Sequence, residues 1–152
     1  MNRSRRNAVK AGGVLALLVA AGIRPALAQG QQWNQAAFAG KTLKDALAAL
    51  GAQGAATSDA IVIKAPEIAE NGAVVPVGVE SKLPGTQSIA LLVEKNPLPL
   101  AASFDLPAGT EPSVTTRVKM GESSDVYVLV KADGKYYFAK KEVKITIGGC
   151  GG

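Results

Sequence analysis

The sequence predicts an all-β fold, an immunoglobulin-like antiparallel β-sandwich with a short N-terminal helix and a flexible C-terminal arm. Two observations support this fold class. From residue 60 onward apolar and polar residues alternate with a period of two, which is typical of half-buried strands. About seven such segments follow one another at spacings of roughly 8 to 15 residues, with turn-forming residues between them, as in small β-sandwiches.

The N-terminal segment has the pattern of an export signal. Arg5 and Arg6 precede an uncharged apolar run, Ala11–Ile23, and a small-x-small cleavage pattern at residues 26–28. The arginine pair favours the twin-arginine route, and the run is shorter than the about 20 residues that a permanent membrane helix needs. We therefore expect residues 1–28 to be removed during export to the periplasm, which leaves no membrane anchor. An uncleaved amphipathic anchor is the alternative.

The positive charge of the full chain comes from this signal segment. The chain has 17 basic and 12 acidic residues, and five of the basic ones precede residue 29. The mature chain, residues 29–152, is therefore formally neutral, with both signs interspersed. Such a composition does not support a phosphate-binding surface, so no nucleic-acid partner is predicted. The five basic residues of the signal are Arg3, Arg5, Arg6, Lys10 and Arg24.

The chain contains no histidine and a single cysteine, Cys150. The absence of histidine excludes Ser-His and Cys-His nucleophile pairs and histidine-ligated metal sites. A single cysteine forms neither an internal disulfide nor a thiolate metal cage. The sequence therefore argues against an enzyme that works alone and predicts no metal and no cofactor. In an exported protein, an unpaired cysteine indicates intermolecular pairing or a reactive thiol.

The short helix is predicted at residues 41–51. Thr42, with Asp45 three residues later, forms a capping-box pattern, and Gly51 ends the helix. An apolar stripe on one side of the helix is expected to pack in or against the core, together with aromatic residues just upstream. The stripe and these aromatic residues are Leu43, Leu47, Leu50, Trp33 and Phe38.

Strands follow along the rest of the mature chain. Pro76 places its strand at a sheet edge, the segment 88–95 is apolar enough to be buried on both faces, and Asp133-Gly134 predicts a tight hairpin. Core packing is the expected role of the alternating apolar residues. The predicted strands are 60–64, 73–82, 88–95, 100–106, 113–120, 125–131, 135–140 and 143–147. The inward sets include Val75, Val77 and Val79, then Val114, Thr116 and Val118, then Val126, Val128 and Val130, and finally Val143, Ile145 and Ile147.

The last five residues, 148–152, read GGCGG and form the predicted arm. Glycine has little conformational preference, so Cys150 is expected on a flexible tether about 10 Å beyond the last strand. The domain division is thus a signal at 1–28, a carrier domain at 29–147 and the arm. Nearby lysines favour the thiolate and the terminal carboxylate opposes it, a balance that the sequence leaves open. The arm glycines are Gly148, Gly149, Gly151 and Gly152, and the lysines are Lys140, Lys141 and Lys144.

Four segments resemble the SoxY family, the sulfur-carrier subunits of the bacterial thiosulfate-oxidising Sox system. They are APEIAENGAVVPV (65–77), ALLVEKNPLPLAASF (90–104), RVKMGESSDVYVLVKADGKYY (117–137) and the terminal IGGCGG. The resemblance covers nearly the whole mature chain. It implies a periplasmic carrier that is not itself an enzyme and that binds sulfur intermediates covalently through Cys150.

The resemblance also implies partners. A haem-containing SoxXA-like enzyme loads thiosulfate oxidatively onto Cys150, and a dimanganese SoxB-like hydrolase then releases sulfate and leaves a persulfide. A SoxCD-like enzyme oxidises that persulfide further, and a SoxZ-like sandwich subunit forms a heterodimer with the carrier. The arm glycines are implied to give the thiol access to the partners' active sites.

Three other interpretations of Cys150 remain. The first is a structural periplasmic module that uses the thiol for an intermolecular disulfide. The second is a carrier of ubiquitin-like type with Gly151-Gly152 adenylated, against which export and the absence of a long central helix argue. The third is an accidental surface thiol, which the symmetric placement among four glycines makes improbable.

Overall fold

The computed structural model describes residues 33–146, so the predicted signal peptide lies outside the described range. Within that range no helix is long and apolar enough to cross a membrane. The described elements are α2 (Gln35–Ala39), α3 (Leu43–Ala49), β1 (Ala56–Thr57), β2 (Ile61–Lys64), β3 (Ile68–Ala69), the 3-10 helix η1 (Gly72–Val74), β4 (Val75–Ser81), β5 (Thr86–Val93), β6 (Leu100–Asp105), β7 (Ser113–Val118), β8 (Ser124–Ala132) and β9 (Lys135–Ile145).

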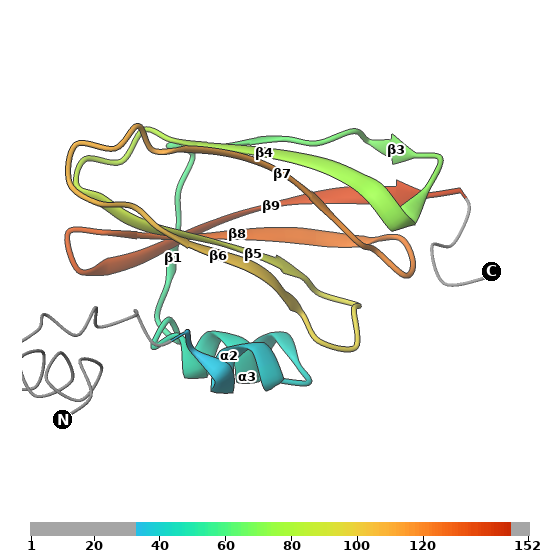
Figure 1. The fold of residues 1–152 in the computed structure, drawn as a ribbon, viewed down its shortest axis with the longest axis horizontal. Helices are drawn as coiled ribbons and strands as arrows, with labels where there is room; N and C mark the ends of the chain where they lie inside the picture. The colour runs from blue at the N-terminus through green and yellow to red at the C-terminus, as the bar shows by residue number, and fades with distance from the viewer. Residues whose placement is uncertain (1–32, 147–152) are drawn as a thin grey trace, which may run out of the picture. The chain divides into compact units, whose positions relative to one another are not determined.

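The strands form two sheets, which confirms the predicted sandwich. The smaller sheet has the order β2-β4-β7, and the larger has the order β1-β9-β8-β5-β6 with β3 also paired to β9. The two helices lie on the outer face of the larger sheet (Figure 1). The ladders are antiparallel except for β1 and β3, which both run parallel to β9. These two-residue strands were not predicted, because two residues carry no periodic pattern.

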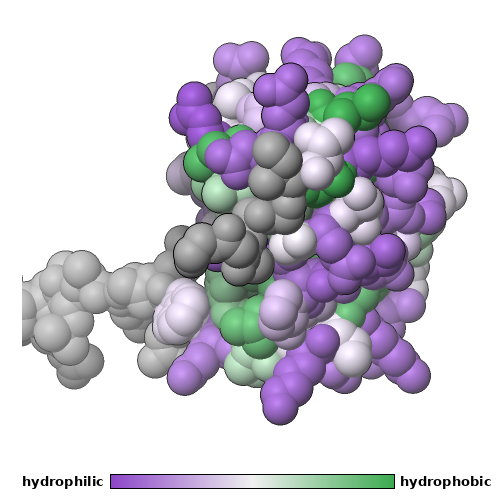
Figure 2. All heavy atoms as spheres, turned by 90° about the vertical axis from the view of Figure 1, so that its right-hand side faces the viewer, coloured by the Kyte–Doolittle hydropathy of each residue, from purple (hydrophilic) through white to green (hydrophobic). Residues whose placement is uncertain are grey.

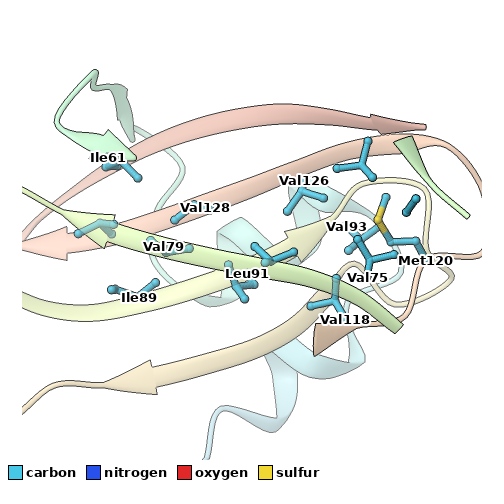
Figure 3. Packing of buried hydrophobic residues seen from close by; sticks show 14 of the residues in the cluster. Ile61, Val75, Val79, Ile89, Leu91, Val93, Val118, Met120, Val126 and Val128 are labelled. Atoms are coloured by element: carbon cyan, nitrogen blue, oxygen red, sulfur yellow. The ribbon is translucent and has the colours of Figure 1, made fainter. Parts of the chain in front are cut away.

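The main core lies between the two sheets (Figure 3). Alternate residues of a strand point to the same face, so the valines at every second position of β4 and β8 all enter this core. Burial of each such side chain contributes about 1.5 to 3 kcal/mol. The predicted inward sets are confirmed for β4 and β8 by the burial of Val75, Val77, Val79, Val126, Val128 and Val130.

A second cluster lies between the larger sheet and the helices. Ala90 and Leu92 of β5 face this cluster, while Ile89 and Leu91 face the main core, and all four are buried. Strand β5 is therefore buried on both faces, as predicted, because the helices cover the side that faces away from the smaller sheet. Phe38 packs against the second cluster as predicted, whereas the side chain of Trp33 is 67% exposed.

The predicted capping box of α3 is confirmed. Thr42 Oγ1 accepts from Asp45 N at 3.1 Å, and Asp45 Oδ2 accepts from Thr42 N at 3.2 Å. Gly51 follows the helix with φ of +73°, a conformation that glycine adopts without strain. The preceding helix, α2, was not predicted. Asn34 caps it, with its side chain accepting from Ala37 N at 3.0 Å.

Strand β4 is the central strand of the smaller sheet, so its predicted edge position is wrong. The pairing with β2 ends at Lys64 opposite Gly78, so at Pro76 the strand is paired only with Arg117 of β7. Pro76 therefore stands where one side of the strand has no neighbour, and the missing N–H interrupts no ladder. Pro76 therefore has an edge-like position within a strand that is otherwise central in its sheet.

The two strands predicted at 135–140 and 143–147 form one strand, β9. The charged residues between them continue the ladder with β8. The side chain of one of them, Lys141, donates from Nζ to Ala65 O at 2.6 Å. The turn before β9 is the predicted hairpin. Asp133 and Gly134 have φ of 47° and 74°, as a type I′ turn requires.

Candidate functional site: the base of the C-terminal arm

The predicted sulfur-attachment residue, Cys150, lies outside the described residues. The same holds for the arm glycines, for Ile147 and for the signal residues Arg5 and Arg6. The structure describes the chain as far as Thr146, one residue beyond β9. The site is therefore built from the base of the arm, which we define as Val143 to Thr146 and the residues that contact them.

The base begins inside the main core. The side chain of Val143 is fully buried, and Ile145 packs partly buried against the same cluster. Val143 pairs with Ser124 of β8, and on the other side of β9 Ile145 pairs with Ala69 of β3. The strand that leads to the arm is thus paired on both sides where it ends.

Strand β3 and its neighbours hold the last two residues of the base. Lys144 N donates to Glu67 O at 2.9 Å, and Thr146 N donates to Ala69 O at 3.1 Å. Thr146 Oγ1 also donates to Glu70 O at 3.5 Å. These bonds continue the pairing of β9 with β3 to the last described residue, so the arm starts from a fixed point.

The loop before β8 holds the other side of the base. Ser123 Oγ accepts from Ile145 N at 2.9 Å. Asn96 fixes this loop, because its Nδ2 donates to Lys119 O at 2.7 Å and its Oδ1 accepts from Gly121 N at 3.2 Å. Sequence reasoning did not assign these residues to the base of the arm, since polar loops and a two-residue strand carry no periodic signal.

The length of the remaining chain limits where the thiol can go. Cys150 is four residues beyond Thr146, so the two Cα atoms lie at most about 14 Å apart. A hollow of about 330 Å³ lies beside Lys135, Tyr136 and Tyr137 at the start of β9. Tyr137 is nine residues before Thr146, or about 30 Å along an extended strand. This hollow is therefore farther from Thr146 than four extended residues can span.

Two of the three lysines predicted to favour the thiolate have partners elsewhere. Lys140 Nζ lies 2.6 Å from Asp125 Oδ2 and 5.6 Å from the centre of the Tyr127 ring. The hydrogen bond to Asp125, with smaller contributions from the charges of Tyr127 and Asp125, raises the pKa of Lys140. Lys141 Nζ donates to Ala65 O. Both ammonium groups are thus held by partners beside β9.

The surface around the base carries charges of both signs. Lys144, Glu67 and Glu70 are exposed, and Ile68 between the two glutamates is 59% exposed. Figure 2 views this end of the molecule, where hydrophilic residues predominate and hydrophobic ones are interspersed. Within residues 33–146 no group of three or more carboxylate, cysteine or histidine side chains is placed to hold a metal ion.

A family model described as sulfur oxidation protein SoxY matches residues 46–150. The match begins in α3, covers the nine strands and extends to Cys150. No match was found among curated proteins. The matched region thus joins the sandwich and the only cysteine of the chain in one family pattern.

Solved structures agree with the family match. The chain is similar to the sulfur carrier protein SoxY from Chlorobium limicola f thiosulfatophilum, with 43% identity and a TM-score of 0.59, over 68% of this chain and 96% of that one. A superoxide reductase (neelaredoxin) from Ignicoccus hospitalis has 24% identity and a TM-score of 0.50, over 56% of this chain and 79% of that one, and shares the fold alone. On the family match and the identity to the Chlorobium protein, the chain belongs to the SoxY family of sulfur oxidation proteins.

Proposed function

We propose that this chain is a periplasmic carrier that binds sulfur intermediates of thiosulfate oxidation covalently through Cys150. As a member of the SoxY family it is a sulfur carrier protein rather than an enzyme. The observation that carries the proposal is the family match, which extends through the sandwich to Cys150. The fixed base supports it, because it keeps a thiol four residues beyond Thr146 within about 14 Å of a rigid body.

The chemistry needs only a sulfur atom from the carrier. In the loading step the Cys150 thiolate and thiosulfate form an S–S bond and give up two electrons, which pass to the haem of a SoxXA-like partner. The product is a cysteine S-thiosulfonate. In the release step a SoxB-like hydrolase adds water to the terminal sulfonate, which leaves as sulfate with two protons, and a persulfide remains on Cys150. A SoxCD-like enzyme acts on that persulfide.

The division of labour explains the composition. The chain has no histidine, so it holds no imidazole base for its own thiol. In the proposed scheme the partners supply metals and acid-base groups. Gly148, Gly149, Gly151 and Gly152 place no side chain beside the thiol, which lets the arm enter a narrow active site. A SoxZ-like sandwich subunit is the proposed heterodimer partner, and a folded pair exported on one signal suits the twin-arginine route.

Intact-mass analysis of the mature protein from thiosulfate-fed cells tests the proposal. We expect sulfur-containing adducts on the C-terminal peptide that disappear on reduction and are absent from a Cys150→Ser variant. Disulfide-linked dimers or glutathione adducts alone would instead favour a structural module. An oxygen-to-sulfur exchange at Gly152 would favour carriage on the terminal diglycine. The mass of the N-terminus in the same spectra tests removal of residues 1–28.

A further inference from the structure

Three large apolar side chains of the described sandwich, residues 34–146, are at least half exposed. They are Ile68, Val74 and Leu98, with exposed fractions of 59%, 53% and 50%. They come from β3, from η1 and from the turn between β5 and β6, which are separate in sequence. Exposed apolar residues that gather on one surface are typical of protein–protein contact sites.

Direct contacts place these three segments at the end of the molecule where β9 ends. Ile68 pairs with Lys144 at the base of the arm. The turn that carries Leu98 is joined through Asn96 to the loop before β8, the same loop that holds the base. Met120 N in this loop donates to Gly72 O of η1 at 2.7 Å. Figure 1 shows β3, the β5–β6 turn and the β7–β8 turn at the end where β9 terminates.

Each of the three side chains stands on a fixed backbone. Leu98 lies between Pro97 and Pro99, whose rings restrict the turn. Ile68 belongs to a paired strand. Val74 ends η1, whose cap Asn71 accepts from Ala73 N at 2.8 Å. Groups that are already ordered lose little entropy on binding, which favours their use in recognition.

We propose that this surface, defined by Ile68, Val74 and Leu98, is the docking surface for the SoxB-like hydrolase that processes the thiol. The inference rests on the proposed function. The arm sets its geometry, because a protein whose active site holds Cys150 must come within about 14 Å of Thr146. It therefore contacts this end of the sandwich. The fitting partner has an apolar patch beside its active-site entrance, with polar groups opposite the charged rim, as protein interfaces commonly have.

Exposed charges of both signs surround this surface and form its rim. Glu67, Glu70 and Lys144 lie beside Ile68, and Lys95 pairs with Glu122 at 3.8 Å near the β5–β6 turn. Two exposed charges at this separation contribute little to stability. Both charges remain available to a partner. Because the rim carries both signs, it can fix the orientation of a docking enzyme, but it does not strongly attract an enzyme of high net charge.

The test measures sulfate release by a SoxB-like hydrolase from the mature chain co-expressed with its SoxZ-like subunit. Cys150 is first loaded with tetrathionate, which forms the S-thiosulfonate and releases thiosulfate without any enzyme. We expect Leu98→Asp and Ile68→Thr each to raise KM about tenfold, the usual cost of losing an important interface side chain. We expect kcat, thermal stability and chemical loading to be unchanged.

Leu98→Met and Ile68→Val keep the apolar surface and are expected to retain the original KM. Ala56→Asp adds a charge on exposed β1, beside the start of β9, and is the control for charge alone. An unchanged KM in both polar variants overturns the proposal, as does an equal rise in Ala56→Asp. Loss of the SoxZ-like subunit from Leu98→Asp would instead assign this surface to the subunit interface. If the loaded original chain releases no sulfate at all, the proposed function fails.

Discussion

At the scale of single residues, Cys150 depends on its neighbours more than on any group that activates it. The chain supplies no histidine. Two lysines of β9, Lys140 and Lys141, contact Asp125 and the carbonyl oxygen of Ala65. In the proposed function, the thiol therefore relies on access to a partner's active site. Access depends on the size of the residues beside it, which is a property that substitution can change without touching the sandwich.

Replacement of the four arm glycines by alanine is expected to lower the rate of enzyme-catalysed processing about tenfold or more. The added methyl groups narrow the accessible conformations and obstruct a tight entrance, and small misplacement of a reacting group is costly. Loading by tetrathionate in free solution is the control and is expected to proceed at the original rate. Equal enzymatic rates in both proteins would show that the glycines do not provide access.

The ion pair of Lys140 and Asp125 predicts a pH dependence of stability. The hydrogen bond to Asp125 raises the pKa of Lys140 above its ordinary value of 10.5. A raised pKa means that the pair stabilises the fold fully below pH 10.5 and loses this effect as the pH rises through the folded-state value. The effect is small, because Lys140 is exposed.

Urea unfolding at a series of pH values checks this prediction. Asp125→Asn should be slightly less stable than the original protein from neutral pH to about pH 10, and the difference should disappear at higher pH. In a Lys140→Met background the same substitution should show no such dependence. A difference that persists above the pKa of Lys140 would assign the effect of Asp125 to packing or to other hydrogen bonds.

At the scale of elements, sequence patterns located most strands and failed where pairing partners decide the outcome. Thr42 and Asp45 form a local motif, so the sequence was sufficient to predict α3. By contrast, the continuity of β9 depends on nine successive partners in β8, which a local pattern does not contain. The position of Pro76 likewise depends on where β2 ends, since the pairing of β4 with β2 stops at Gly78.

The contact between α2 and α3 depends on Gly40. A Cβ added at this buried residue would lie 2.9 Å from Ala46 N and 3.3 Å from Ala37 O, both of them backbone atoms. Gly40→Ala is therefore expected to force the two helices apart and to destabilise the protein by about 1 to 3 kcal/mol. Gly54→Ala is the matched control, because a Cβ at Gly54 has no atom within 4 Å.

Thermal and urea unfolding of these two variants give the comparison. Gly54→Ala should stay within about 0.5 kcal/mol of the original protein, as is usual for surface substitutions. Equal stability of the two variants would mean that the helices move apart at no cost, and so that they cover the sheet only loosely. Release of Leu92 from burial, detected by faster amide exchange in β5, is a second expected consequence of Gly40→Ala.

At the scale of the whole molecule, the sandwich and the arm could be predicted from different features of the sequence. The sandwich follows from periodicity, so its core could be predicted from the sequence. Cys150 could also be identified, because it is the only cysteine and stands among glycines. The base of the arm could not, since Ser123 and Ala69 contact β9 through single hydrogen bonds from positions 22 and 77 residues before Ile145 and Thr146.

The separation of these roles predicts that folding does not need the arm. The hydrogen bonds of β9 to β3 reach Thr146, and among residues 33–146 the last fully buried side chain is Val143. Deletion of residues 148–152 should therefore leave the melting temperature within about 2 °C of the original, because surface changes rarely exceed 0.5 kcal/mol. The same deletion should abolish sulfur loading. Val143→Ala should do the reverse, with a loss of about 2 kcal/mol and chemical loading of Cys150 retained. Calorimetry and intact mass on the two variants, each beside the original chain, make the comparison. A marked fall in melting temperature on deletion would mean that residues 148–152 contribute to the fold and that the sandwich is not independent of its arm.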